Sequence, residues 1–356
     1  MLKRCPVIGL LLVLAACSAD PNGQTLQKLY VLSSNSNDVT VIDVATNEIL
    51  TSVEVGELPH GIATPKSQFP LYVATEGDDG LAVVDPVNDT LIKKYDFFGK
   101  RPNEIECTSD GRYVYVPAMG DGRYEIFDTR KEEIVTRIPT DGTPHNTVVS
   151  PDDKYMYLVP HDRGALSIEA QQARGRPVSL NKKIYVVDTA TRSVVDKIQT
   201  GNTPRPTAIS PDGSRLYVNT DNLMGFLVID TAQREVIQTA EYTLTREEQA
   251  TPSRSHGIGV SPDGKEVWST NINHGFVHAF DVTQDPPVEI AKIKTGNTPL
   301  WLTMTPDGQT VYTANTADDT ISVIDRASKK ERTRIQLPKG KAPKRMLVLT
   351  VPVSSS

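Results

Sequence analysis

Cysteine is scarce in this chain, with only 3 among 356 residues. Cys5 and Cys17 lie in an N-terminal segment that has the features of a targeting signal, which leaves Cys107 as the one thiol expected to be free in the folded protein. A single thiol cannot form an intrachain disulfide, so the fold must be stable without one. Because Cys107 lies in an apolar stretch, we expect it to be a small buried side chain.

Long basic runs are absent as well. The chain has 38 Lys and Arg against 44 Asp and Glu, which gives a net charge of −6. Removal of Lys3 and Arg4 with the N-terminal segment would change this to −8, from 36 basic and 44 acidic residues. The basic stretch KGKAPKR at 339–345 is short. Non-specific binding to nucleic acid requires a large Lys/Arg surface, so we predict no nucleic-acid partner.

The N-terminal apolar run is too short to cross a membrane as an ordinary helix. PVIGLLLVLAA spans 6–16, whereas a transmembrane helix needs about 20 apolar residues. The run ends in LAAC at 14–17, which resembles the lipobox of bacterial lipoproteins. The resemblance implies that Cys17 receives a diacylglycerol and that Ser18 directs the protein to the outer membrane, facing the periplasm. The alternative is an ordinary cleaved signal peptide.

These features divide the chain into three parts. We predict a signal peptide at 1–16, a flexible tether at 17–27 and one folded domain at 28–351. In this interpretation the protein contacts the membrane only through its lipid anchor. We expect a monomer of the bacterial cell envelope, and a periplasmic protein is a candidate partner.

The strongest signal in the sequence is an internal repeat built around Pro-Asp-Gly turns. SPDGSRLYVNT, SPDGKEVWSTN and TPDGQTVYTAN show the pattern at 210–220, 261–271 and 305–315. Proline presets φ, aspartate can bond the backbone and glycine tolerates positive φ, so each motif predicts a hairpin between two strands. A third strand that ends in Asp and a fourth, amphipathic strand follow in each repeat. Each repeat is therefore predicted to be a four-stranded antiparallel blade, with strands A to D from the inside outward.

Seven repeats can be counted. The first begins with a B strand, in KLYVLSS at 28–34, and the chain ends with an A strand, in APKRMLVLTV at 342–351. The last strand can therefore complete the first blade, which protects the sheet edges that a linear array would expose. We predict an all-β, seven-bladed propeller that is closed by a shared blade.

Several strands resemble the YVTN family of β-propeller repeats. LYVNT at 216–220 and VYTAN at 311–315 are similar to the strand that gives this family its name, and GNTPRPTAISPDGSRLYV at 201–218 follows its consensus. The resemblance covers about 28–350 and implies the propeller fold. It implies little about function, because propellers support unrelated chemistries.

The residues that begin the A strands should surround one end of the central channel. We call them the mouth positions, and in blade order they are Lys344, His60, Asn103, His145, Arg205, His256 and Trp301. The three histidines are spaced by two, two and three blades, close to a three-fold arrangement. His161 ends a B strand on the same face. The two longest connections, 160–183 and 241–254, also belong to this face and could cover the histidines.

Histidines around an axis suggest a metal site. Neutral imidazole binds zinc, copper and iron, and three histidines with an open fourth position are typical of catalytic or transport sites. We predict His60, His145, His256 and His161 as ligands of a transition metal (Cu, Zn or Fe) or a haem-like cofactor. Metal–nitrogen bonds are only about 2.0–2.1 Å long, so a wide channel would favour a larger cofactor. The alternative is that the histidines are polar side chains in a wet channel.

The other mouth positions suggest an anionic small ligand. Arg205 and Lys344 could pair with carboxylates, Trp301 could stack on a planar ring or plug the channel, and Asn103 could donate a hydrogen bond. Glu104 and Glu106 interrupt the pattern of their strand, either as a solvated channel wall or as a proton-handling pair. The sequence does not distinguish between these two roles.

Three functions follow from these residues. The first is a periplasmic binding protein that handles a metal or cofactor in a redox or metal pathway, since no acid–base set is evident. The second is an enzyme that uses His161 or the three mouth histidines. It would be a lyase, a lactonase or an oxidase. The third is a scaffold for protein interaction through the two long loops.

Overall fold

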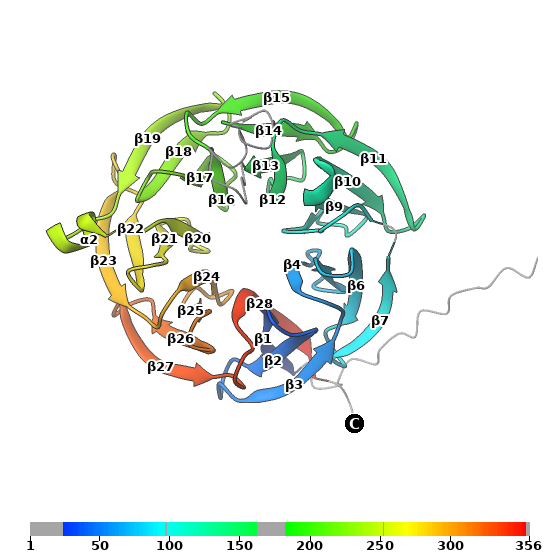
Figure 1. Ribbon diagram of the computed structural model, residues 1–356, viewed down its shortest axis with the longest axis horizontal. Coiled ribbons are helices and arrows are strands. Elements are labelled where there is room, and N and C mark those ends of the chain that lie inside the picture. Colours follow the sequence, from blue (N-terminus) through cyan, green and yellow to red (C-terminus); the bar gives the residue numbers. More distant parts are fainter. Residues whose placement is uncertain (1–23, 97, 162–181, 252, 354–356) are drawn as a thin grey trace, which may run out of the picture.

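A computed structural model describes residues 24–96, 98–161, 182–251 and 253–353. Within these residues, the strands form seven four-stranded antiparallel sheets arranged as blades around a central axis (Figure 1). The predicted seven-bladed propeller is therefore confirmed. Cys17 and most of the connection predicted at 160–183 lie outside the described residues.

Blade one combines strands from both ends of the chain, and the next three blades follow in sequence order. Blade one contains β28 (Pro343–Pro352), β1 (Thr25–Ser33), β2 (Asp38–Asp43) and β3 (Ile49–Glu54). Blade two contains β4 (Pro59–Ala63), β5 (Leu71–Thr75), β6 (Gly80–Asp85) and β7 (Thr90–Tyr95). Blade three contains β8 (Glu106–Cys107), β9 (Tyr113–Ala118), β10 (Arg123–Asp128) and β11 (Glu133–Pro139). Blade four contains β12 (Thr143–Val149), β13 (Tyr155–His161), β14 (Lys183–Asp188) and β15 (Ser193–Gln199).

The last three blades follow without interruption. Blade five contains β16 (Pro204–Ile209), β17 (Arg215–Thr220), β18 (Gly225–Asp230) and β19 (Glu235–Glu241). Blade six contains β20 (Ser255–Val260), β21 (Glu266–Asn271), β22 (Phe276–Asp281) and β23 (Val288–Lys294). Blade seven contains β24 (Pro299–Met304), β25 (Thr310–Asn315), β26 (Thr320–Asp325) and β27 (Lys330–Gln336).

The Pro-Asp-Gly turns form through the hydrogen bonds that their residue types allow. In blade five, the Ser210 hydroxyl donates to Asp212 Oδ1 at 2.5 Å, and the backbone N–H of Ser214 donates to the same oxygen at 3.0 Å. Gly213 has a φ of 75°, which a glycine adopts without a steric penalty. The turn therefore reverses the chain between β16 and β17.

The ring closes through the two ends of the described chain. β28 pairs antiparallel with β1, from Thr25 opposite Pro352 to Val31 opposite Met346. This pairing confirms the shared blade. The first strand begins at Thr25, inside the segment that the sequence assigned to the tether.

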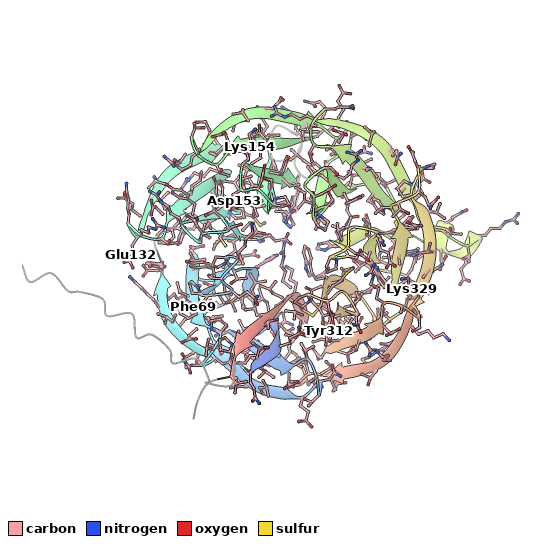
Figure 2. All side chains as sticks on the ribbon, turned by 180° about the vertical axis from the view of Figure 1, so that it is seen from behind. Phe69, Glu132, Asp153, Lys154, Tyr312 and Lys329 are labelled. Carbon is pink, nitrogen blue, oxygen red and sulfur yellow. The ribbon has the colours of Figure 1, made fainter. Side chains whose placement is uncertain are left out.

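The hydrophobic core consists of layers between neighbouring blades. Tyr312 of blade seven, labelled in Figure 2, packs with Leu29 and Val348 of blade one, and all three are buried. Fully burying a side chain such as Leu or Val stabilises the fold by about 1.5–3 kcal/mol. Cys107 is free and buried, as expected. Each such layer joins one blade to the next.

Helices are short in the described part of the chain. A 3-10 helix, η1, spans Met119–Asp121, and α2 spans Arg246–Ala250. No helix among these residues is long and apolar enough to cross a membrane. Glu248 of α2 forms an ion pair with Lys292 of the outermost strand β23, and α2 lies at the outer rim of the propeller (Figure 1). The expectation that 241–254 covers the mouth positions is therefore wrong for the helix, because this ion pair holds it at the rim.

Candidate functional site

The innermost strands are irregular at the level of the mouth positions. Their pairing with the second strand shifts register between Pro59 and Gly61 in blade two and between Ser255 and Ile258 in blade six. Blade four shows the same shift between Thr143 and Asn146. Such bulges redirect side chains and are common next to functional sites. Each mouth residue therefore lies at a break in the regular sheet.

Register corrects the mouth position of blade seven. Trp301 lies opposite Ala314 of its neighbouring strand, just as Gly61 lies opposite Ala74 in blade two. Trp301 therefore matches Gly61, and Leu300 matches His60. The sequence assignment was shifted by one residue, because the bulge obscures the alternation of the strand. One of the seven mouth positions is consequently aliphatic.

The three mouth histidines are buried. His60 is 5% exposed, His145 is 3% and His256 is 6%, and Asn103 is fully buried. This burial argues against the alternative of polar side chains in a wet channel, because a buried imidazole must have specific partners.

His60 lies among charged groups from three blades. Its Nδ1 is 2.5 Å from Glu76 Oε2, and its Nε2 is 2.7 Å from Lys344 Nζ. Asn103 Nδ2 lies 3.0 Å from Nδ1 and donates to Glu76 Oε2 at 3.2 Å. Arg101 Nε donates to the other Glu76 oxygen at 2.9 Å. The carboxylate accepts the Nδ1 proton and thereby fixes the tautomer, so that Nε2 carries the lone pair.

Glu104 is fully buried beside His60 and His145. Its Oε2 accepts hydrogen bonds from Arg345 at 2.7 Å and from Asn146 Nδ2 at 3.0 Å. Its Oε1 lies 3.8 Å from His145 Nε2 and accepts no hydrogen bond from the described residues. A buried carboxylate oxygen without a hydrogen bond is uncommon and requires an explanation.

Arg345 was missed in the sequence. Its guanidinium pairs with Glu104 and lies 3.9 Å from the centre of the Trp301 ring. Trp301 is thus a stacking surface for a side chain of the neighbouring blade, rather than a plug. The signal in the sequence was weak, because Arg345 follows Lys344 in a short basic stretch near the C-terminus.

His145 links this group to a second strand of its own blade. The His145 ring lies 4.3 Å from the His161 ring and 6.4 Å from the His60 ring, measured between centroids. Among the described residues, His60, Glu104 and His145 form a group whose potential ligand atoms all lie within 4.8 Å of one another. We call these three residues the axial cluster.

His256 and Arg205 lie outside the axial cluster. His256 Nδ1 donates to the Leu300 carbonyl oxygen at 3.0 Å, and its ring contacts Trp301 edge-on at 6.0 Å. Arg205 pairs with Asp221 of its own blade at 2.6 Å. The near three-fold arrangement of histidines is therefore replaced by two histidines and one carboxylate from blades two, three and four.

Burial and charge set the protonation of these groups. Burial, assisted by Lys344, lowers the pKa of His60 to about 4, and burial lowers the pKa of His256 to about 3. Burial alone would raise the pKa of Glu76, but hydrogen bonds from His60 and Arg101 outweigh it and lower the pKa to about 2. Near pH 7 both imidazoles are therefore neutral, the form that binds metals.

Glu104 and Glu106 differ in their surroundings. Burial opposes ionisation of Glu104, but the charge of Arg345 outweighs it and lowers the pKa of the carboxyl. Burial raises the pKa of Glu106 to about 7, and its Oε1 accepts the Cys107 N–H at 3.0 Å. Glu104 is therefore a fixed anion of the cluster, whereas Glu106 lies in β8 and outside the cluster.

Comparison with known proteins supports the class of the fold. The model of the family described as "Lactonase, 7-bladed beta-propeller" matches residues 184–348. Antigen Lp49 of Leptospira interrogans is 27% identical over 200 residues, which are 54% of this chain and 42% of that protein. The match thus spans less than half of the length of this relative.

Solved structures show the same architecture. Hydrazine synthase of Kuenenia stuttgartiensis superposes with a TM-score of 0.71 at 22% identity, covering 84% of this chain and 92% of that one. The periplasmic gluconolactonase PpgL of Pseudomonas aeruginosa superposes with a TM-score of 0.72 at 18% identity, covering 92% of this chain and all of that one. At this level of identity the likeness concerns the fold alone. The chain is a seven-bladed β-propeller with a buried histidine–carboxylate cluster at its axis.

Proposed function

We propose that the axial cluster binds a divalent transition-metal ion. The observation that carries this proposal is the approach of the ligand atoms of His60, Glu104 and His145 to within 4.8 Å of one another, in a buried position. Metal–ligand bonds of about 2.0–2.2 Å place neighbouring ligands about 3–3.5 Å apart, so a small contraction completes the site. The ligands come from the adjacent blades two, three and four, so a single ion can contact all three. The width of the channel therefore does not require a larger cofactor.

The surroundings of the cluster support this proposal. Glu76 holds His60 through Nδ1, which is the usual support for a metal-binding histidine, and Nε2, now 2.7 Å from Lys344 Nζ, carries the lone pair. Arg345 and Asn146 both contact Oε2 of Glu104, which leaves Oε1 directed toward His145. Two imidazoles and one carboxylate suit zinc, iron or copper. His161 lies close enough to His145 to support the site or to enlarge it.

The cellular setting is also a proposal. We infer from the lipobox-like LAAC that the chain is a lipoprotein anchored through Cys17 and facing the periplasm, and from its strands that it belongs to the YVTN type. In that compartment the site would act in a redox or metal-handling pathway. A haem-like cofactor, a protein partner and a scaffold role remain predictions.

Metal analysis of the purified protein tests the main proposal. We expect about one ion per chain by elemental analysis, and loss of most of it in His60→Gln, His145→Gln and Glu104→Gln. His274→Gln is the matched control, because His274 is a half-buried histidine on a loop, where its Nε2 contacts the Thr251 carbonyl. A metal-free wild type that also fails to take up Zn²⁺ or Co²⁺ would refute the proposal.

A second candidate function is the hydrolysis of a sugar lactone. The family match over 184–348 favours it, and so does the Glu76–His60 pair beside the Lys344 ammonium. The neutral His60 could accept a proton from water, while Lys344 stabilises the oxyanion. Proton release from D-glucono-δ-lactone would be followed with the wild type and His60→Gln. Equal rates for the two proteins and for buffer would exclude this activity on that substrate.

A further inference from the structure

Both ends of the described chain lie on the face of the propeller opposite the mouth positions, which we call the far face. β28 begins at the mouth and runs to Pro352, and Thr25 at the start of β1 pairs with Pro352. The backbone N–H of Val353 donates to the Gln24 carbonyl oxygen at 3.1 Å, so the two ends lie side by side. The N-terminal segment therefore joins the propeller on the far face of blade one.

The connection to the proposed lipid anchor is short. Cys17 and Gln24 are seven residues apart. A fully extended chain covers at most about 3.3–3.6 Å per residue, so the far face of blade one lies within about 25 Å of an anchored Cys17. The anchor would thus hold this face at a high effective concentration next to the bilayer, on the order of millimolar. Under that condition a modest apolar surface is sufficient for binding.

The far face of blades one and two exposes apolar side chains around this point. Phe69, in the connection 64–70 between β4 and β5, is 41% exposed (Figure 2), and Val353 is 37% exposed. Gln68 Oε1 accepts the backbone N–H of Thr350 at 2.5 Å, which holds this connection against the last part of β28. The outermost strands of the two blades start on the same face with exposed apolar pairs, Ile49 with Leu50 and Leu91 with Ile92. We call these six apolar residues the apolar sector.

The other five blades carry acidic turns where the apolar sector has Phe69. In blades three to seven, the turn between the innermost strand and the second strand contains an exposed aspartate, namely Asp110, Asp152, Asp212, Asp263 and Asp307. The connection 64–70 instead has Lys66 as its one charged residue, and blade one has no such turn because the two ends of the chain meet there. A bilayer that contains anionic lipid attracts lysine and repels carboxylates. The charge pattern of the far face therefore favours the apolar sector as the part that contacts a bilayer.

Two other features of the far face do not distinguish its sectors. The aspartates that end the third strands, such as Asp43 and Asp85, occur in every blade and accept hydrogen bonds from their own turns. Exposed apolar pairs also start the outermost strands of blades four and five, as Val236 does with Ile237. In those blades, however, the apolar pair shares the far face with an acidic turn. The distinguishing features are thus the chain ends, Phe69 and the missing aspartate.

We propose that the apolar sector docks on the bilayer that holds the lipid anchor of Cys17. This inference rests on the proposed anchor and does not depend on the metal site. Transfer of the exposed apolar side chains from water into the bilayer interface favours the docked state. The contact with the membrane then extends beyond the lipid anchor. Because the mouth lies on the opposite face, docking turns the axial cluster toward the aqueous compartment.

Spin labelling of the full-length lipoprotein tests this inference. The protein is reconstituted in vesicles of phosphatidylethanolamine and phosphatidylglycerol, and a nitroxide is attached through Phe69→Cys or, at the mouth, through Leu58→Cys. Leu58 is 45% exposed, and buried Cys107 and acylated Cys17 do not compete for the label. Collisions are measured with oxygen, which is enriched in the bilayer, and with a water-soluble nickel chelate. The Phe69→Cys label should lose collisions with the chelate and gain collisions with oxygen, relative to the Leu58→Cys label.

Ile49→Cys and Val236→Cys provide a second, matched pair that leaves the connection 64–70 unaltered. Ile49 lies opposite Ile42, and Val236 lies opposite Ile229, so the two residues occupy the same register position in blades one and five. They are 41% and 36% exposed. The Ile49→Cys label should be shielded from the nickel chelate and reached by oxygen. The Val236→Cys label should remain accessible to the chelate.

The outcomes separate docking from anchoring. Mass spectrometry determines whether Cys17 carries a diacylglycerol, and a chain without it would overturn both the anchor and the docking. With the anchor present, equal access of the chelate to the labels of each pair would overturn the docking and leave the anchor intact. Labels of Phe69→Cys and Ile49→Cys that are shielded from both reagents would also overturn it, because a protein surface would then cover the sector.

Discussion

The two halves of the mouth use the same repeat position in different ways. In blades one to four, Lys344, His60 and the Glu104–Arg345 pair interact through side chains from different blades. In blades five to seven, Arg205 pairs with Asp221 of its own blade, and His256 donates to the backbone of Leu300. A repeated residue type therefore does not define a site. The partners available to each side chain decide whether it can bind a ligand or is structurally satisfied.

Glu104→Ala should produce the largest change, because it removes the carboxylate that compensates Arg345. The Arg345 side chain is only 13% exposed, and an uncompensated buried charge costs about 3–5 kcal/mol. Urea unfolding at pH 7 should show a decrease of this size in the free energy of unfolding. Glu106→Ala, two residues further along the chain, should cost less than about 2 kcal/mol. Equal losses in the two variants would mean that the Arg345 pair has no special role.

Two histidine variants test the difference between the halves directly. His60→Gln should weaken Co²⁺ binding by at least about 100-fold, or about 2.7 kcal/mol, because it removes a ligand and the support of Glu76 is then lost. His256→Gln should change the affinity less than about threefold, since His256 lies outside the axial cluster. Absorption titration measures both. A comparable loss in His256→Gln would restore the three-fold histidine arrangement predicted from the sequence.

The sequence predicted the fold more completely than the site. The Pro-Asp-Gly turns and Asp-ending strands are local features that repeat, so seven blades and their closure could be counted. The site depends on bulges, which shift register by one residue and displaced the assignment from Leu300 to Trp301. It also depends on contacts between blades, such as Arg345 with Glu104, which sequence spacing does not specify. Glu104 stood out as a charge in an apolar strand, but its partner could not be inferred.

Acid should destabilise the half of the mouth that contains His256. The pKa of His256 is lowered from 6.5 to about 3 by burial, so its contribution to stability is present above pH 6.5 and is lost as the pH falls toward 3. Between pH 7 and 5 this loss amounts to about 2 kcal/mol. Urea unfolding at both pH values should show a shallower pH dependence for His256→Gln than for the wild type, by about this amount. An unchanged dependence would mean that His256 is not buried in its neutral form.

Arg205→Gln should have the smallest effect, and it sharpens the contrast between the two halves of the mouth. Arg205 was predicted from the sequence to hold an anionic ligand, but its Nε already donates to Asp221 at 2.6 Å within blade five. The Asp221 side chain is 31% exposed, and ion pairs that are partly exposed contribute about 0–1 kcal/mol. Unfolding in urea should therefore change by less than about 1 kcal/mol. The affinity for Co²⁺ should match the wild type, because Arg205 lies outside the axial cluster and pairs with Asp221 of its own blade. A clearly weaker affinity for Co²⁺ in Arg205→Gln would instead mean that the two halves of the mouth act together.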